Sequence, residues 1–170
     1  MSLKSKGINA ERELIHKFWG VGWSAVRVAG SGSMRYPSSD ILAANRIRRL
    51  AIECKTTKDQ KKYFEKNEIE DLKKFADTFG AEPWLAVKFK GNDWYFVTLE
   101  DLTETRGSFL IDSENAKNKG LLFEEIIKKC LPSPNGFFDF QLFSHYFADN
   151  ILYVAFNPCN SSFHKNQNSQ

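Results

Sequence analysis

The chain has 170 residues, of which 42% are hydrophobic and 14% aromatic, and its formal net charge is +3. This composition excludes a disordered polypeptide, and the length predicts one domain, with or without an appendage, that buries a sizeable core. No apolar run resembles a signal peptide or reaches membrane-spanning length, so we expect a cytoplasmic protein that makes no membrane contact. Three cysteines without metal-ligand spacing also favour a reducing compartment.

The first part of the chain predicts one helix followed by three strands. An apolar stripe at helical spacing predicts a helix over residues 5–19. A strand follows over residues 23–29, and the glycine- and serine-rich residues 30–33 are typical of a flexible loop. Two apolar runs, residues 41–44 and 50–55, flank a basic turn and predict a hairpin.

The next part predicts two more helices and two more strands. Asn67 and Glu70 have the spacing of a capping box and open a helix predicted over residues 67–79, which Gly80 ends. Residues 84–89 and 94–97 predict strands, and residues 120–130 predict a short amphipathic helix. The expected fold class is therefore α/β, with a central mixed β-sheet flanked by helices.

The chain changes character after residue 130. Residues 131–170 are rich in phenylalanine, contain Lys165 as their one basic Lys or Arg residue, and show no clean helical or strand period. We therefore expect a domain over residues 1–130 and a C-terminal extension over residues 131–170 of unknown role. That extension is either a cover for an apolar face or a poorly ordered or non-native addition, and residues 1–3 are a candidate cloning remnant.

The predicted hairpin carries two carboxylates and a lysine that suit phosphodiester chemistry. Asp40 opens its first strand, and Glu53 and Lys55 interrupt its second strand on one face, because side chains alternate along a strand. Carboxylate oxygens bind hard divalent cations, and a lysine can hold or activate a water beside a phosphate. Taken alone, the second-strand pair is explained better by a solvent-facing ion pair, since acid-x-Lys spacing recurs at Asp59 and Asp71.

Residues upstream of the hairpin favour the catalytic interpretation. Glu11, on the first predicted helix, supplies a third carboxylate for a cation held by Asp40 and Glu53. Arg12 and Arg27 are candidates to clamp phosphate oxygens, because guanidinium groups bind them bidentately. Glu11 and Arg27 each have a structural alternative. An acidic residue near the start of a helix interacts favourably with the helix dipole, and Arg27 can extend its charged end to water from an edge strand. Together they predict Mg²⁺-dependent phosphodiester cleavage, with Mn²⁺ as a substitute metal.

Basic residues gather in short stretches, which favours a polyanionic partner, although a solvated charged surface is the alternative. The residues that we expect to contact DNA are Lys4, Lys6, Arg12, Arg27, Arg46, Arg48, Arg49 and Lys58.

The order of these segments resembles the archaeal Holliday junction resolvases of the PD-(D/E)xK nuclease superfamily. The resemblance rests on residues 6–14, 26–31, 40 and 52–55, continues to residue 122, and covers about residues 4–130. The Pro-Asp dipeptide of the superfamily is absent, because Pro37 lies three residues before Asp40.

The resemblance implies roles for individual residues. The catalytic positions correspond to Glu11, Asp40, Glu53 and Lys55. The implied metal ligands are Asp40, Glu53 and the main-chain carbonyl of Cys54, with Glu11 nearby. Arg12, Arg27 and Ser31 match positions that contact DNA or support cleavage, Ser31 from a mobile loop. Phe75 and Phe79 match the dimer surface of family members, which are homodimers.

The resemblance further implies metal-dependent resolution of four-way DNA junctions by paired nicking of opposed strands. A two-fold symmetric dimer presents two equivalent active sites, and recognition through phosphates makes binding steeply dependent on salt. A sliding clamp or a branch-migration helicase is a candidate recruiting partner. Two alternatives stay open: another endonuclease with the same core, of the repair or restriction type, and a catalytically silent DNA-binding module.

Overall fold

The computed structural model describes residues 3–28 and 36–128, with the backbone alone for residues 3–6. By its internal contacts the chain divides into Met1–Lys129 and Cys130–Gln170, and the described residues belong to the first unit. Ser31, the side chains of Lys4 and Lys6, and the extension over residues 131–170 lie outside the described residues, so the predictions made for them stay predictions. Within the described part, no helix combines the length and apolar character needed to cross a membrane.

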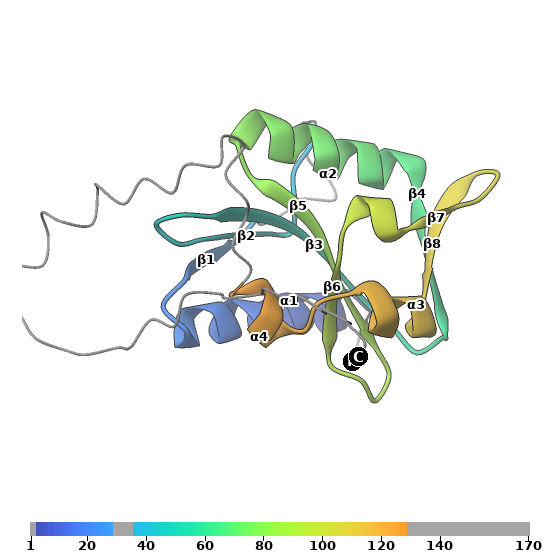
Figure 1. The fold of residues 1–170 in the computed structure, drawn as a ribbon, viewed down its shortest axis with the longest axis horizontal. Helices are drawn as coiled ribbons and strands as arrows, with labels where there is room; N and C mark the ends of the chain where they lie inside the picture. The colour runs from blue at the N-terminus through green and yellow to red at the C-terminus, as the bar shows by residue number, and fades with distance from the viewer. Residues whose placement is uncertain (1–2, 29–35, 129–170) are drawn as a thin grey trace, which may run out of the picture. The chain divides into compact units, whose positions relative to one another are not determined.

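A five-stranded mixed sheet forms the centre of this unit, in the order β1-β2-β3-β5-β6 (Figure 1). Neighbouring strands are antiparallel except for β3 and β5, which are parallel. The strands are β1 (Ser24–Arg27), β2 (Ile41–Ala44), β3 (Arg49–Thr57), β5 (Glu82–Phe89) and β6 (Trp94–Val97). The predicted α/β class with a mixed sheet is confirmed.

The parallel pair β3 and β5 is covered on both faces, which explains its nearly continuous apolar sequence. Residues 50–52 of β3 and residues 84–87 of β5 are all buried. Parallel strands need a long crossover connection. Here the chain crosses through β4 (Lys61–Glu65) and α2 (Lys66–Phe79), so α2 lies beside the strands that carry the candidate catalytic residues.

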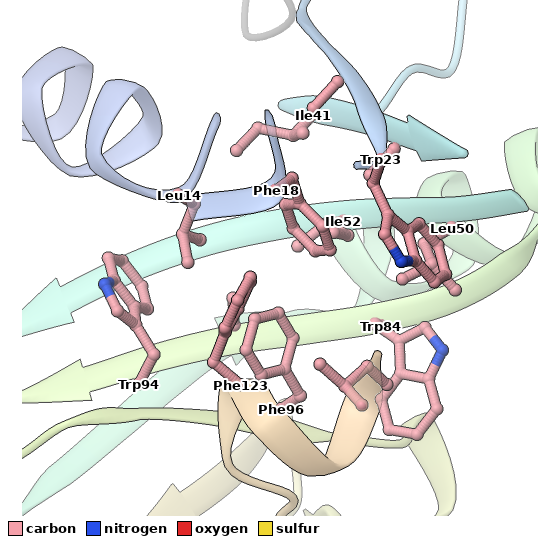
Figure 2. Packing of buried hydrophobic residues seen from close by; sticks show 14 of the residues in the cluster. Leu14, Phe18, Trp23, Ile41, Leu50, Ile52, Trp84, Trp94, Phe96 and Phe123 are labelled. Carbon is pink, nitrogen blue, oxygen red and sulfur yellow. The ribbon is translucent and has the colours of Figure 1, made fainter. Parts of the chain in front are cut away.

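One face of the sheet holds an aromatic core (Figure 2). Helix α1 (Leu3–Gly20) contributes Leu14 and Phe18, both fully buried, and the single-turn helix α4 (Phe123–Ile126) contributes Phe123. The ring of Phe18 meets that of Phe123 edge-on, with 5.1 Å between centroids, and that of Trp23 at 5.7 Å. This packing fixes α1 on the sheet and thereby the position of Glu11 on the helix.

Helix α2 covers the opposite face through three buried residues at helical spacing, Ile69, Leu72 and Ala76. A second sheet, in the order β4-β8-β7, joins this side. Its further elements are β7 (Thr103–Glu104) and β8 (Ser108–Asp112), preceded by the 3-10 helix η2 (Leu99–Asp101) and followed by α3 (Ser113–Lys119). The sequence did not predict this sheet, because β4 and β8 each bury one residue, Phe64 and Ile111, and so lack a clear apolar alternation.

The predicted N-cap of α2 is wrong by two residues, and the predicted first residue of the helix by one. The helix begins at Lys66 with Glu65 as its N-cap, in place of Asn67. The carboxylate that accepts the cap amide belongs to Glu68, whose Oε2 lies 2.9 Å from the Glu65 nitrogen. Glu68 is therefore directed towards the start of the helix and towards β3.

Of the helix predicted over residues 120–130, the described part up to residue 128 contains the single turn of α4. Leu121 exchanges two backbone hydrogen bonds of 2.8 Å with Phe96, which joins it to the edge of β6 as an isolated bridge. A Cβ atom on Gly120 would lie 2.5 Å from the carbonyl oxygen of Ala116, so the turn after α3 requires glycine. Pairing with the sheet therefore overrides the helical spacing of the apolar residues.

Candidate active site

Asp40 is held at the start of β2 by main-chain hydrogen bonds to both neighbouring strands. Its amide donates to the carbonyl of Ile52 at 3.1 Å, and its carbonyl accepts from the amide of Val28 at 2.8 Å. Its side-chain Oδ2 accepts a hydrogen bond of 3.0 Å from the main-chain amide of Cys54. The carboxylate is therefore directed towards the middle of β3.

Glu53 and Lys55 extend from one face of β3, and Lys55 Nζ lies 2.8 Å from Glu53 Oε1. Ala51, which shares their face by strand alternation, packs in the same buried cluster as Ile69, Leu72 and Ala76 of α2. This is therefore the face of β3 that α2 covers. Lys55 Nζ also lies 2.8 Å from Glu68 Oε1 on α2. The ammonium group thus joins carboxylates from two elements of the fold.

Burial and neighbouring charge alter the acid–base properties of these groups. Burial, followed by the charge of Asp40, raises the pKa of Glu53 to about 7, although Lys55 opposes this shift. Burial alone would lower the pKa of Lys55, but the carboxylates of Glu53 and Glu68 outweigh it and raise that pKa. The lysine is therefore an ammonium at neutral pH, beside two carboxylates that repel each other.

Cys54 lies between these residues on the opposite face of β3, where its side chain packs against the aromatic core. Burial and the nearby carboxylates, that of Asp40 foremost, raise the pKa of its thiol well above the ordinary value. A thiol of this kind is a poor nucleophile and a poor metal ligand. Its contribution to the site is therefore made by the main chain.

Glu11 reaches the site from α1, and its carboxylate is engaged by Arg27 of β1. Arg27 Nε donates to Glu11 Oε2, and 32% of the Arg27 side chain is exposed against 12% of that of Glu11. Both residues line the same cavity as Asp40 and Glu53. The sequence predicted a metal contact for the acid and a phosphate contact for the arginine, and these contacts stay predictions beside the observed pair.

All the predicted catalytic residues whose positions are described line one open cavity of about 1300 Å³. Acidic side chains outnumber basic ones on its described lining, which would repel a phosphate unless a cation offsets part of the charge. The acids are Glu11, Asp40, Glu53, Asp59, Glu65, Glu68 and Asp71, and the bases are Arg27, Lys55, Lys58, Lys88 and Lys90.

Asp40 and Glu53 form a donor pair that fits a hard divalent cation. Within residues 3–28 and 36–128, no three His, Cys, Asp or Glu side chains converge closely enough to hold a metal ion by themselves. Mg²⁺ is commonly bound through one or two carboxylates and keeps water in its other positions. Burial and then repulsion from Asp40 raise the pKa of Glu53, and a positive charge between the two carboxylates would relieve that repulsion.

The predicted DNA-contacting residues divide between the cavity and other surfaces. Arg27 and Lys58 line the cavity. Arg12 is exposed on α1, and Arg46 and Arg49 are exposed where β2 turns into β3, at the opposite end of the strands from Asp40. The structure therefore brings two of these side chains to the site and leaves three on surfaces beyond its lining.

Arg48 is buried and structural, so its predicted contact with DNA is wrong. Its side chain is 4% exposed, and its guanidinium binds both carboxylate oxygens of Glu82, each at 2.7 Å. It also donates to the carbonyl oxygen of Ile126 at 2.5 Å and lies over the ring of Trp23. The arginine thus ties the start of β3 to β5 and to the end of α4.

Among the charged residues of the cavity lining that had no predicted role, Glu68 and Lys88 form ion pairs. Glu68 contacts Lys55, as described above, and its place near the start of α2 was obscured by the capping pattern at Asn67. Lys88 of β5 binds both oxygens of Glu13 at 2.8 and 3.0 Å. These contacts join residues distant in the sequence, and no local pattern signals them.

Phe75 and Phe79, the predicted dimer residues, stack on α2 with 5.6 Å between ring centroids and 20° between ring planes. Phe75 is partly buried against the core of that face, whereas Phe79 is 50% exposed.

The mixed sheet, with an aspartate, a glutamate and a lysine of adjacent strands in one acidic cavity, defines a nuclease of the PD-(D/E)xK type. The family can be stated more narrowly. The chain belongs to the archaeal Holliday junction resolvase (Hjc) family, whose model matches residues 2–132. The predicted resemblance is thereby confirmed.

Relatives and a solved structure agree with this assignment. The crossover junction endodeoxyribonuclease Hjc of Archaeoglobus fulgidus is 40% identical over 127 residues, which cover 75% of this chain and 93% of that protein. The Hjc of Methanocaldococcus jannaschii is 34% identical over 122 residues, 72% of this chain and 86% of that protein. The structure of the A. fulgidus Hjc, a Holliday junction resolvase from an archaeal hyperthermophile, matches with a TM-score of 0.67 and 38% identity, covering 71% and 98% of the two chains.

Proposed function

We propose that this protein is an endodeoxyribonuclease that resolves four-way DNA junctions by hydrolysing one phosphodiester in each of two opposed strands. The observation that carries the proposal is the convergence of Asp40, Glu53 and Lys55 in one acidic cavity. It occurs in a chain that belongs to the archaeal Holliday junction resolvase family.

Asp40 and Glu53 would hold a divalent cation, Mg²⁺ or Mn²⁺, together with the main-chain carbonyl of Cys54 and with Glu11 nearby. The cation supplies a water of lowered pKa and offsets charge on the phosphate. The Asp40 carboxylate is already oriented for this role by the Cys54 amide, so binding requires little rearrangement of that side chain. Lys55 presents a permanent positive charge in the same cavity and stabilises negative charge that develops on the phosphate oxygens.

Basic residues around the cavity position the DNA backbone. Arg27 and Lys58 line the cavity and would contact phosphates next to the cleaved bond. Arg12, Arg46 and Arg49 are exposed and suit phosphates farther along the arms of a junction, and we assign Lys4 and Lys6 to the same task. Ser31 is proposed to support cleavage from its loop.

A homodimer suits a substrate with near two-fold symmetry, because two identical active sites then face two opposed strands. We propose that Phe75 and Phe79 form part of the contact between protomers, since Phe79 presents half of an apolar ring to solvent. A sliding clamp or a branch-migration helicase would recruit the dimer to junctions in the cytoplasm.

The test compares cutting of a four-way junction with cutting of a linear duplex that contains the same arm sequences, with and without Mg²⁺. We expect cutting of the junction alone, and only with metal. Glu53→Gln and Asp40→Asn should bind the junction and fail to cut it. Equal cutting of duplex and junction would instead favour a repair or restriction endonuclease. Metal-dependent cutting that survives both substitutions would assign the activity to other residues, and a wild-type chain that binds without cutting would favour a silent DNA-binding module.

A further inference from the structure

We infer that Glu68 is a positioning residue that holds the Lys55 ammonium in the active site while Glu53 is engaged by the cation. The inference rests on the proposed catalytic role of Lys55 and adds a residue from α2 to a group of proposed catalytic residues that α1 and the strands of the main sheet supply.

The two carboxylate oxygens of Glu68 have separate partners. Oε2 accepts the main-chain amide of Glu65 at 2.9 Å, and Oε1 lies 2.8 Å from Lys55 Nζ. A carboxylate that is anchored through one oxygen to the backbone presents the other in a defined direction. Because 34% of the Glu68 side chain and 24% of the Lys55 side chain are exposed, the contact lies at the wall of the cavity and is partly shielded from water.

Lys55 needs a partner other than Glu53 during the reaction. Its side chain has four rotatable bonds, and fixing such a chain costs conformational entropy that a single mobile contact does not offset. In the structure its ammonium is shared by Glu53 and Glu68, each at 2.8 Å. A cation held by Glu53 would offset the charge of that carboxylate and would repel the Lys55 ammonium. Glu68 then remains as the anion that keeps the lysine in place.

A helix cap alone does not account for the contact. Capping of the Glu65 amide requires one oxygen of the side chain at position 68, and a glutamine supplies such an oxygen. The second oxygen and the negative charge serve Lys55. Glu68→Gln therefore retains the means to cap α2 and loses the charge that holds the lysine, which separates the two roles.

The experiment is a double-mutant cycle of Glu68→Gln and Lys55→Met, measured as single-turnover cleavage of a four-way junction at saturating enzyme and Mg²⁺. The matched control is Glu70→Gln, which removes the same charge from an exposed position of α2 that does not line the cavity. Junction affinity and melting temperature are measured for every variant, and cleavage is followed well below the lowest melting temperature of the set.

We expect Glu68→Gln to lower the single-turnover rate by about tenfold to a hundredfold, the usual effect of removing a group that orients a catalytic residue. Junction affinity of Glu68→Gln should differ from that of the wild type by no more than about twofold, which is the usual error of such comparisons. The control Glu70→Gln should cut at the wild-type rate. In the Lys55→Met background, Glu68→Gln should lower the rate no further.

Three results would overturn the inference, and they are distinguishable from failure of the proposed function. If Lys55→Met abolishes cutting while Glu68→Gln cuts at the wild-type rate, Glu68 has no positioning role and the proposed function stands. An equal loss of rate from Glu68→Gln in both backgrounds shows that its effect does not pass through the lysine. If Lys55→Met cuts at the wild-type rate, the role of Lys55 fails and the inference fails with it.

Discussion

Arg27 Nε donates a hydrogen bond to Glu11 Oε2 and so joins β1 to α1 at the wall of the cavity. The pair brings a carboxylate near Asp40 and Glu53 and sets a positive charge beside it. It uses the Nε atom of the guanidinium, whereas a phosphate can be bound through the terminal nitrogens of the fork. One arginine can thus orient an acid of the site and contact the DNA backbone.

Arg27→Ala should lower the rate of junction cleavage by about a hundredfold, as expected when a donor to the reacting phosphate is removed. The change also leaves Glu11 without its cationic partner. Arg27→Lys keeps the charge and loses the planar guanidinium group, so its cleavage rate should lie between those of the wild type and Arg27→Ala. The control Arg12→Ala removes an exposed arginine from α1 and should weaken junction binding and its salt dependence while leaving the rate at saturation unchanged. An unaltered rate for Arg27→Ala would exclude its phosphate contact.

Arg48→Ala should destabilise the protein by about 3–5 kcal/mol, because it leaves the Glu82 carboxylate partly buried without its partner. Chemical denaturation measures this loss, and junction affinity measured where the variant is folded should match that of the wild type. Arg49→Ala is the matched control: its side chain is exposed on the next residue, so stability should be retained and junction affinity should fall. The reverse pattern would restore Arg48 to the DNA-contacting surface.

The part of the site that could be predicted from the sequence depends on local geometry. Alternation along β3 places Glu53 and Lys55 on one face, and the hairpin sets Asp40 beside them, so a pattern of few residues encodes the arrangement. The helix and strand order of the main sheet follows from apolar periodicity in the same way.

The features of the site and fold that the sequence did not predict depend on contacts between residues distant in the sequence. Arg48 and Arg49 are neighbours in the sequence, yet one is buried against Glu82 and the other is exposed, and composition cannot separate them. Glu68 meets Lys55 because α2 returns over β3 after the parallel crossover, which no local pattern specifies. The small sheet was missed for a related reason, since its strands gain their burial from the cluster of α2.

Glu53→Gln should stabilise the metal-free protein at alkaline pH. Burial and the charge of Asp40 raise the pKa of Glu53 from 4.5 to about 7, so between these values the folded state binds more protons than the unfolded state. The associated stability is complete below about pH 4.5 and is lost as the pH rises through about 7. Glutamine does not ionise and escapes this loss, which amounts to at most about 3 kcal/mol at 1.36 kcal/mol for each unit of pKa.

Thermal unfolding of wild type and Glu53→Gln across this range measures the effect. The melting temperatures should agree at the acidic end, diverge as the pH rises from about 4.5 to about 7, and stay apart above that, with the variant higher. Glu70→Gln, an exposed change of the same kind on α2, should show no such divergence. A variant that is less stable than the wild type at alkaline pH would mean that the ion pair with Lys55 outweighs the burial of the Glu53 charge.

Removal of divalent metal should abolish junction cutting and spare junction binding, because the carboxylates serve the metal and the basic residues serve the phosphates. Added Mn²⁺ should raise the melting temperature of the wild type, since a ligand that binds the folded state alone stabilises it. Asp40→Asn should lose most of this increase, whereas Asp77→Asn, an exposed change on α2, should keep it. An equal increase in both variants would place the metal away from Asp40.

Phe79→Ala should weaken self-association, because an apolar ring that is 50% exposed and stacked on Phe75 is stabilised when a second protomer covers it. Loss of a central aromatic contact typically costs about 2 kcal/mol or more, which raises the dimer dissociation constant at least about thirtyfold. Sedimentation equilibrium measures that constant. Tyr63→Ala is the control, since Tyr63 is 53% exposed on β4 and its loss should leave association unchanged.

Phe79→Ala also tests whether the two active sites of a dimer act together. On a supercoiled plasmid that extrudes a four-way junction, paired nicking within one binding event gives linear product, and separate nicking gives nicked circles. Phe79→Ala should shift the product from linear towards nicked circles at protein concentrations where the wild type is dimeric, and raising the concentration of the variant should restore linear product by mass action. A variant that stays dimeric, or a monomeric variant that still yields linear product at low concentration, would move the dimer contact away from α2.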